Sequence, residues 1–127
     1  MKLGRLNGME ESLAKKKPDI LAAWVRPSLE APRTRHYSGL PPELTDGEDY
    51  RVELPRAEII TIEPEPNAAG IFLFRYLRDG TFITDTWHES VEDAKFQAEY
   101  EYGTTDQEWV AVPGDVTGPV AFLVEHT

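Results

Sequence analysis

Cysteine is absent from this sequence. A disulfide scaffold, a thiol nucleophile and thiolate ligation of a metal are therefore excluded. Long apolar runs are missing too. The opening stretch MKLGRLNGMEESLAKKKPD lacks the apolar core of a signal peptide, and no segment approaches the roughly 20 apolar residues that span a membrane. We therefore expect a cytoplasmic protein with no membrane partner, although the lack of cysteine also fits a secreted bacterial protein.

Positive charge is scarce beyond residue 35. The 127 residues include 13 Lys and Arg against 23 Asp and Glu, for a formal net charge of -10. Residues 1–35 hold eight basic and four acidic side chains, a sum of +4, whereas residues 36–127 hold five and nineteen, a sum of -14. Binding to a phosphate backbone requires clustered positive charge, so we expect no nucleic-acid partner. An acidic surface suits a basic protein partner, but the same charge also keeps a small protein soluble.

Prolines and lysines distinguish residues 1–50 from the rest of the chain. The stretch PDILAAWVR, residues 18–26, predicts a short helix, because Pro18 is tolerated in a first turn and Pro27 stops the helix. No period continues beyond Pro27, which predicts an extended segment. We therefore divide the chain into a basic, proline-rich N-terminal arm, residues 1–50, and a folded domain, residues 51–127.

The folded domain shows several elements with clear signals. AEIITIEPE, residues 57–65, is rich in β-branched residues and predicts a strand. GIFLFRYLRDGTFITDTW, residues 70–87, predicts a hairpin, since its Asp-Gly pair suits the positive φ angles of a type I′ turn. EWVAV and GPVAFLVEH, residues 108–112 and 118–126, predict two later strands. With a helix after the hairpin, this order predicts an α+β fold: an antiparallel sheet of four to five strands, one main covering helix and the short N-terminal helix.

The helix that follows the hairpin is well marked. Ser90 and Asp93 form a capping-box pattern at its start, and Gly103 is placed for a left-handed C-terminal cap. Helical periodicity then separates two sets of side chains. We expect the first set to face the sheet: Val91, Ala94, Ala98 and Tyr102. The second set is Phe96 and Tyr100, an i, i+4 pair on the opposite side in an acidic setting.

Pairing through a two-residue turn also predicts the two faces of the hairpin. We expect the more aromatic face to be the core. Its members are Phe72, Phe74, Tyr76, Ile83, Asp85 and Trp87. The other face holds Leu73, Leu77, Phe82, Thr84 and Arg75. A carboxylate on the core face needs a partner or a place at the edge of the sheet.

The strongest functional candidate is a partner-binding surface on the helix. It comprises Phe96, Tyr100, Glu92, Asp93 and Glu99, together with Trp109. Aromatic side chains supply contact area, and acidic ones select a basic partner. The alternative is that the N-terminal arm covers these aromatics. It would do so with Leu21, Trp24, Val25 and Leu29.

A second candidate is a polar site at the end of the hairpin, formed by Asp85, Trp87 and His88. A histidine held by a carboxylate can serve acid–base chemistry, which would make the protein a small enzyme or small-ligand binder. No Ser-His-Asp or Glu-x-x-His spacing accompanies these residues, so we predict no catalytic residue. The three histidines are scattered, and no glycine-rich phosphate cradle is present, so we expect neither a metal nor a cofactor.

The stretch ITDTWHESVEDAKFQAEYEYG, residues 83–103, resembles a pattern in small bacterial proteins. In those proteins a strand ends in Asp-Thr-Trp-His, and a helix with an aromatic and acidic end follows. In size, acidity and layout the chain is also similar to immunity proteins of bacterial toxin systems. The resemblance implies a bacterial α+β fold and a non-enzymatic inhibitor that covers a basic site on a partner protein. An accessory domain that forms a homodimer is a further alternative.

Overall fold

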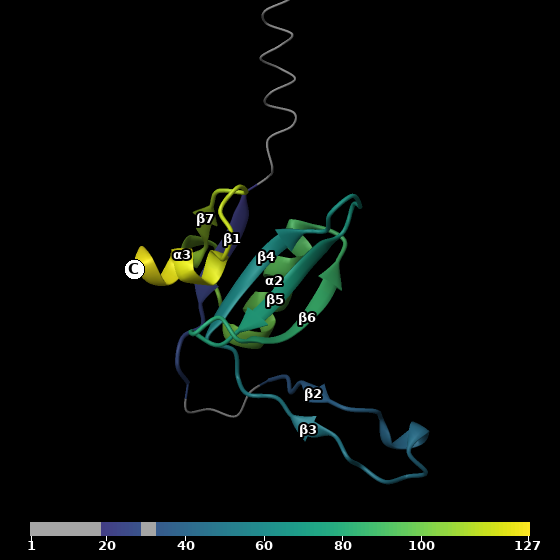
Figure 1. Ribbon diagram of the computed structural model, residues 1–127. Helices are drawn as coiled ribbons and strands as arrows, with labels where there is room; N and C mark the ends of the chain where they lie inside the picture. Colours follow the sequence, from purple (N-terminus) through teal and green to yellow (C-terminus); the bar gives the residue numbers. More distant parts are fainter. Residues whose placement is uncertain (1–18, 29–32) are drawn as a thin grey trace, which may run out of the picture.

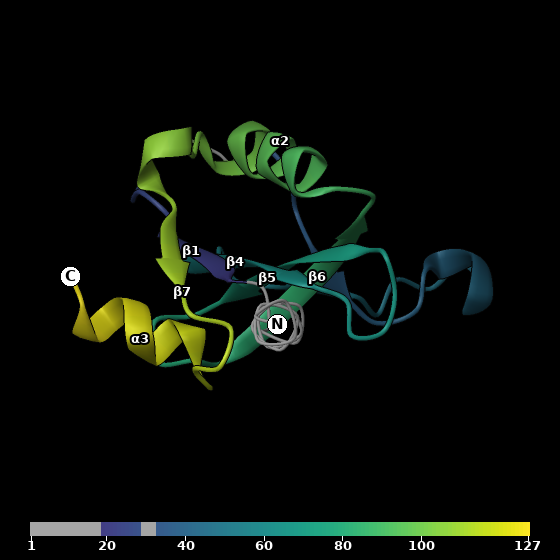
Figure 2. The same cartoon turned by 90° about the horizontal axis from the view of Figure 1, so that it is seen from above.

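A five-stranded antiparallel sheet is the centre of the computed structural model, which describes residues 19–28 and 33–127. The strand order is β6-β5-β4-β1-β7 (Figure 1). The strands are β1 (Ile20–Trp24), β4 (Ile59–Pro64), β5 (Ile71–Tyr76), β6 (Phe82–His88) and β7 (Val110–Val112). Helices α2 (Val91–Tyr102) and α3 (Pro119–Glu125) pack on opposite faces (Figure 2). The predicted α+β class with an antiparallel sheet is therefore confirmed.

Strand β1 replaces the helix that the sequence predicted over residues 18–26, so that prediction is wrong. β1 lies between β4 and β7 and is covered on both faces. Ala23 belongs to the core under α2, and its neighbour Ala22 belongs to the core under α3. An apolar run that is buried on both faces has no amphipathic period to separate strand from helix. A strand from the first fifty residues is thus an inner strand of the sheet that residues 51–127 form.

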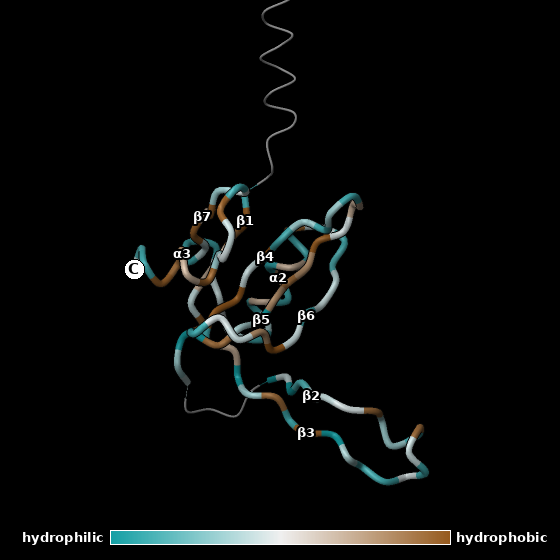
Figure 3. Tube along the Cα trace, viewed as in Figure 1, coloured by the Kyte–Doolittle hydropathy of each residue, from teal (hydrophilic) through white to brown (hydrophobic). Residues whose placement is uncertain are grey.

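The chain between β1 and β4 forms a two-stranded ribbon that projects from the sheet (Figure 1). It pairs β2 (Tyr37–Ser38) with β3 (Val52–Glu53), and the 3-10 turn η1 (Pro42–Leu44) lies between them. Several of its apolar side chains are exposed, and its hydropathy alternates along the ribbon (Figure 3). They are Leu40, Leu44, Tyr50 and Val52. The extended segment predicted after Pro27 contains β2 and η1, whereas β3 follows residue 50.

The hairpin of β5 and β6 forms as predicted, but its faces are the reverse of the prediction. Leu73 and Arg75 point toward α2 and are buried, whereas Phe72, Phe74 and Tyr76 lie on the other face. The inner face packs closely against Ala94 and Ala98 of α2, and this contact encloses Leu73. The aromatic face was therefore wrongly assigned to the core.

The register of the hairpin is also shifted at its closed end. Phe74 pairs with Asp85 and Phe72 with Trp87, as expected. A bulge then pairs Tyr76 with Phe82, and Ile83 packs against the α2 core instead of the aromatic face. The turn is not type I′ because only one of its two central residues, Gly80 with φ 92, has a positive φ. The extra residue of a bulge changes the side to which the following side chains point.

Helix α2 follows the sequence signals closely. The Ser90 side chain accepts a hydrogen bond from the Asp93 backbone N–H at 3.0 Å, and Gly103 closes the helix with φ 74. Ala94 and Ala98 are fully buried against the sheet. Their small side chains let the helix backbone approach the strands, so the predicted alanine stripe is confirmed.

Helix α3 replaces the last strand that the sequence predicted, which makes that prediction wrong. Pro119 occupies the first turn, where its missing N–H is not needed, and Gly118 precedes it with φ 79. Val120 and Leu123 are spaced i, i+3 and are both buried, in the core that α3 forms with β1 and β7. No helix among the described residues has the length and apolarity needed to cross a membrane.

Candidate functional site

A buried ion pair lies between α2 and the sheet. Arg75 on β5 donates from Nη2 to Glu101 Oε2 at 2.5 Å and from Nε to Oε1 at 3.3 Å. Both side chains are almost completely buried. The pair forms because Arg75 follows Leu73 on the inner face of β5 and Glu101 follows Ala98 on the inner side of α2. Two desolvated charges at this distance need each other and further hydrogen bonds to offset their burial.

Neighbouring side chains supply those hydrogen bonds. Glu101 also accepts from Gln97 Nε2 at 2.6 Å and from His36 Nε2 at 2.9 Å. Burial by itself would raise the pKa of Glu101, but the hydrogen bonds from Arg75, His36 and Gln97 outweigh it and lower the pKa to about 2. His36 directly precedes β2, so this contact ties the projecting ribbon to the underside of α2.

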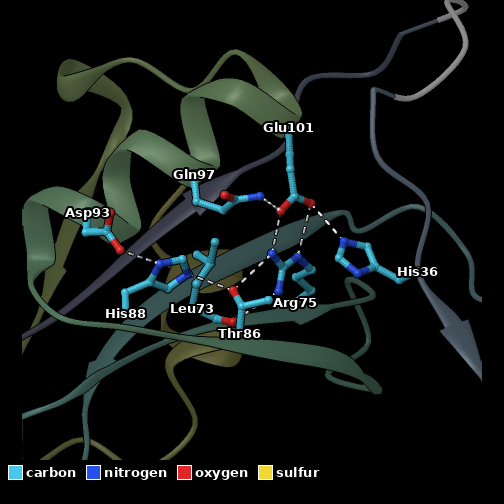
Figure 4. A network of polar contacts seen from close by, with 8 residues as sticks. All are labelled: His36, Leu73, Arg75, Thr86, His88, Asp93, Gln97 and Glu101. Atoms are coloured by element: carbon cyan, nitrogen blue, oxygen red, sulfur yellow. Dashed lines mark hydrogen bonds and ion pairs between the residues drawn. The ribbon is translucent and has the colours of Figure 1, made fainter.

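The network continues from Arg75 to the start of α2 (Figure 4). Arg75 Nη2 donates to Thr86 Oγ1 at 3.2 Å, and Thr86 Oγ1 lies 2.7 Å from His88 Nε2. His88 Nδ1 lies 2.9 Å from Asp93 Oδ2. The imidazole of His88 thus bridges the Thr86 hydroxyl and the Asp93 carboxylate. The chain of contacts therefore joins the two ends of α2 through the sheet.

The order hydroxyl, imidazole, carboxylate is the one that nucleophilic hydrolases use. Here each group has a structural partner instead. The Thr86 oxygen is held by Arg75 beneath α2, His88 is buried, and the backbone of Asp93 belongs to the cap of the helix. This arrangement orients and fixes side chains, and it fastens the helix to β6. We interpret the network as a structural element.

The polar site predicted from Asp85, Trp87 and His88 is not brought together. Asp85 and Trp87 are exposed on the aromatic face of β6, whereas His88 points to the α2 side of the same strand. Trp87 Nε1 donates instead to Glu65 Oε1 at 3.0 Å. Its indole lies against Gly70, where an added Cβ would fall within 1.9 Å of Nε1. The close approach explains why residue 70 is a glycine.

A small cavity lies on the inner face of the sheet. It has a volume of about 60 Å³, lies beside Glu101 and is lined in part by His36, Arg56, Arg75 and Tyr102. Drug-sized ligands and cofactors occupy pockets of about 300–1,000 Å³, so this cavity holds no organic cofactor. Within residues 19–28 and 33–127, no three His, Asp or Glu side chains are grouped as ligands for a metal.

The outer side of α2 is open, as the helical periodicity predicted. Phe96 is 68% exposed and Tyr100 is 49% exposed. Leu21 and Val25 pack under α2 from the sheet, Trp24 packs on the α3 side, and Leu29 lies outside the described residues. Among the described residues, Arg33 reaches this side: its Nη1 donates to the Tyr100 carbonyl at 3.4 Å, and its guanidinium lies 6.0 Å from the Tyr100 ring centroid.

A concavity of about 310 Å³ adjoins Phe96 on this outer side. It lies between α2 and the 3-10 turn η2 (Asp106–Glu108), and Trp109 lines it although this residue also packs against the core. Glu92, Glu99 and Asp106 surround it, and Lys95 is paired with Asp106 at 3.4 Å. The structure thus brings four of the six predicted residues to one hollow: Glu92, Phe96, Glu99 and Trp109.

The far wall of this hollow is held in place by β1. Arg26, just after β1, donates to Glu108 at 2.8 and 3.1 Å and to the Gly103 carbonyl at 2.6 Å. Hydrogen bonds from Arg26 and from the Thr105 backbone lower the pKa of Glu108. The turn that carries Trp109 is therefore fixed relative to the end of α2.

Two groups of residues were missed by sequence analysis. Arg75 and Glu101 were not paired, although each is a charged residue on a stripe of otherwise small or apolar side chains. Charged residues are almost never buried unless they are paired, and this rule could have predicted the ion pair between Arg75 and Glu101. The outer aromatic face of β5 and β6 was missed because it was assigned to the core.

Comparison with protein-family models, curated proteins and solved structures finds no match to this chain. The resemblance to bacterial immunity proteins stays a prediction.

Proposed function

We propose that this is a non-enzymatic binding protein that uses the outer side of α2 against a basic site on a partner protein. The binding surface consists of Phe96, Tyr100, Glu92, Glu99 and Trp109. An inhibitor of the immunity-protein kind, acting in the cytoplasm, is the most concrete form of this role. Asp93 has a smaller part than the sequence suggested, because its carboxylate already contacts His88.

The exposure of Phe96 is the single observation that carries the proposal. Phe96, with 68% of its surface in water, is grouped with the half-exposed Tyr100 beside a hollow that Trp109 lines, and grouped exposed aromatics mark interaction surfaces. Burying such a ring in a complex contributes about 1.5–3 kcal/mol. Aromatic side chains in a pocket are the residues that dominate protein–protein binding energies.

Charge supports the choice of a basic partner. Glu92 and Glu99 flank Phe96 on the helix, whereas Asp106 across the hollow is paired with Lys95. The formal net charge of -10 adds a long-range attraction for a positively charged protein. Such attraction raises the association rate more than the final affinity, and it weakens as salt screens it.

The test is site-specific photo-crosslinking in cells that produce the protein naturally. A photoreactive phenylalanine analogue replaces Phe96, and a control protein carries the same analogue at Thr117, an exposed position in the loop before α3. We expect the analogue at position 96 to capture one basic protein that the control does not capture. The purified partner must then lose affinity for the Phe96→Ala/Tyr100→Ala variant. Equal capture by both positions, or unchanged affinity of that variant, would contradict the proposal.

A further inference from the structure

The outer face of the sheet is only half covered. Helix α3 packs over β1, β7 and part of β4, on the side opposite α2 (Figure 2). The half formed by β5 and β6 carries a row of aromatic side chains, which we call the aromatic sheet face. Its members are Phe72, Phe74, Tyr76, Phe82 and Trp87. Phe82 and Trp87 are 52% and 53% exposed.

The rings of this face are arranged next to one another. Phe72 and Phe74 have ring centroids 5.4 Å apart, and Phe82 lies edge-on to Phe74 at 6.0 Å and to Tyr76 at 6.1 Å. These spacings are those of aromatic pairs that stabilise each other. The face is therefore an ordered aromatic surface that exists before any partner arrives.

Carboxylates lie among the rings. Asp85 is directly opposite Phe74 and two residues from Trp87 on the same side of β6. No hydrogen bond or ion pair from the described residues reaches its carboxylate. Glu65 accepts from Trp87, and Glu63 accepts from Thr61 at 2.7 Å. Three negative groups thus border an aromatic surface.

Tyr76 lies partly buried among these carboxylates, and its hydroxyl donates to Glu63 Oε2 at 3.4 Å. Burial and the nearby carboxylates of Glu63 and Asp85 raise the pKa of Tyr76 to about 12. An aromatic surface with negative potential attracts cations, because the faces of the rings and the carboxylates act in the same direction.

We propose that the aromatic sheet face binds arginine side chains from an extended basic segment of a partner protein. The guanidinium stacks on the rings near Phe74 and Trp87 while its N–H groups donate to Asp85. Arginine fits this surface better than lysine. Its planar, weakly hydrated guanidinium stacks on aromatic rings and donates two parallel hydrogen bonds to one carboxylate. A second copy of this chain fits poorly, because its own aromatic face and ribbon carry negative charges. This surface is separate from the outer side of α2, so the two can be tested independently.

The test is a nuclear magnetic resonance titration of the full-length, 15N-labelled protein. The probe is a capped synthetic peptide of alternating arginine and serine, and the control peptide carries citrulline, a neutral analogue of arginine, in place of every arginine. We expect the Trp87 indole and the β5–β6 amides to shift with the arginine peptide and to stay unchanged with the citrulline peptide. Because both peptides have the same shape, the difference isolates the positive charge.

Two variants locate the binding. Asp85→Asn keeps the size of the side chain but removes one exposed charge beside the aromatic rings. We expect it to lower the affinity for the arginine peptide about fivefold. Glu99→Gln removes the same charge on the outer side of α2 and should leave the titration of the Trp87 indole unchanged. The titration of the Trp87 indole does not depend on whether the outer side of α2 binds a partner, so the two proposals can fail separately.

Several outcomes would overturn the inference. These are shifts confined to α2, equal binding of the citrulline peptide, and an Asp85→Asn variant with unchanged affinity. Shifts of the Trp87 indole with protein concentration alone would show that a second copy occupies the face. Nuclear Overhauser contacts between residues 1–18 and Trp87 in the free protein would show that this chain covers its own face. Either finding would replace the proposed occupant.

Discussion

Arg75 and Glu101 are 26 positions apart in the chain, and their side chains meet between β5 and α2 at 2.5 Å with almost no access to water. The contact determines how α2 lies on the sheet, because neither charge can be left alone in this layer. It also joins the projecting ribbon to the same point through His36. The outer side of α2, where we place the binding surface, is thus positioned from below by an ion pair.

Replacing one member of this pair should cost more than replacing both. We expect Arg75→Met to lower the free energy of unfolding by about 3–5 kcal/mol, since it removes the arginine that is paired with the buried Glu101 carboxylate. The double variant Arg75→Met/Glu101→Leu should recover part of this loss. Urea unfolding followed by circular dichroism measures the wild type, Arg75→Met, Glu101→Leu and the double variant. Losses that simply add would show that the two side chains do not interact.

Acid should weaken the fold through Glu101. The pKa of Glu101 is about 2 in the folded protein, below its ordinary value of 4.5. The ionised Glu101 therefore contributes fully to the free energy of unfolding above about pH 4.5, and this contribution disappears as the pH falls toward 2. The difference corresponds to about 3 kcal/mol of unfolding free energy. We expect the pH dependence of unfolding between about pH 5 and pH 2 to be shallower in Glu101→Gln than in the wild type. The same slope in both proteins would assign the acid sensitivity to other carboxylates.

His88 should act on stability through its two hydrogen bonds. We expect His88→Phe to lower the free energy of unfolding by about 1–3 kcal/mol, because it removes the hydrogen bonds that His88 makes with Thr86 and Asp93. His88→Gln retains one donor and one acceptor and should lose less. Thermal unfolding by calorimetry measures both variants. If His88→Phe unfolds like the wild type, the network does not fasten α2 to β6.

The local signals of the sequence predicted α2 and the presence of the β5–β6 hairpin, although not which face of the hairpin is buried. The cap at Ser90, the close at Gly103 and the alanine stripe each depend on neighbouring residues, and each is confirmed. Strand β1 and helix α3 depend on distant contacts instead. β1 is a strand because β4 and β7 pair with it on either side, and α3 is a helix because Val120 and Leu123 meet a core that β1 helps to build.

The candidate site was predicted only in part for the same reason. Exposure of Phe96 and Tyr100 follows from the helical period alone, so the sequence was sufficient. The residues around Trp109 do not indicate that Trp109 and Phe96 line the same hollow. That arrangement depends on η2, which Arg26 at the end of β1 holds through Glu108. The bulge after Arg75 also places Ile83 on the α2 side of the hairpin. No single residue there predicts a bulge.

The oligomeric state separates a binding protein from a homodimerising domain. We expect a monomer at micromolar concentration by size-exclusion chromatography with light scattering, since the exposed aromatics are surrounded by acidic groups that repel a second copy. Tyr100→Glu should leave the mass unchanged. A dimeric wild type that becomes monomeric in Tyr100→Glu would assign these rings to self-association.

The outer side of α2 is tested most directly by calorimetric titration of the captured partner with the wild type and with Phe96→Ala/Tyr100→Ala. The rings are exposed, so the variant should keep the unfolding temperature of the wild type, and any change belongs to binding. We predict at least about a 30-fold loss of affinity in the variant, and a clear loss for the wild type between about 50 mM and 500 mM salt. An affinity that hardly changes with either the variant or the salt would contradict the account.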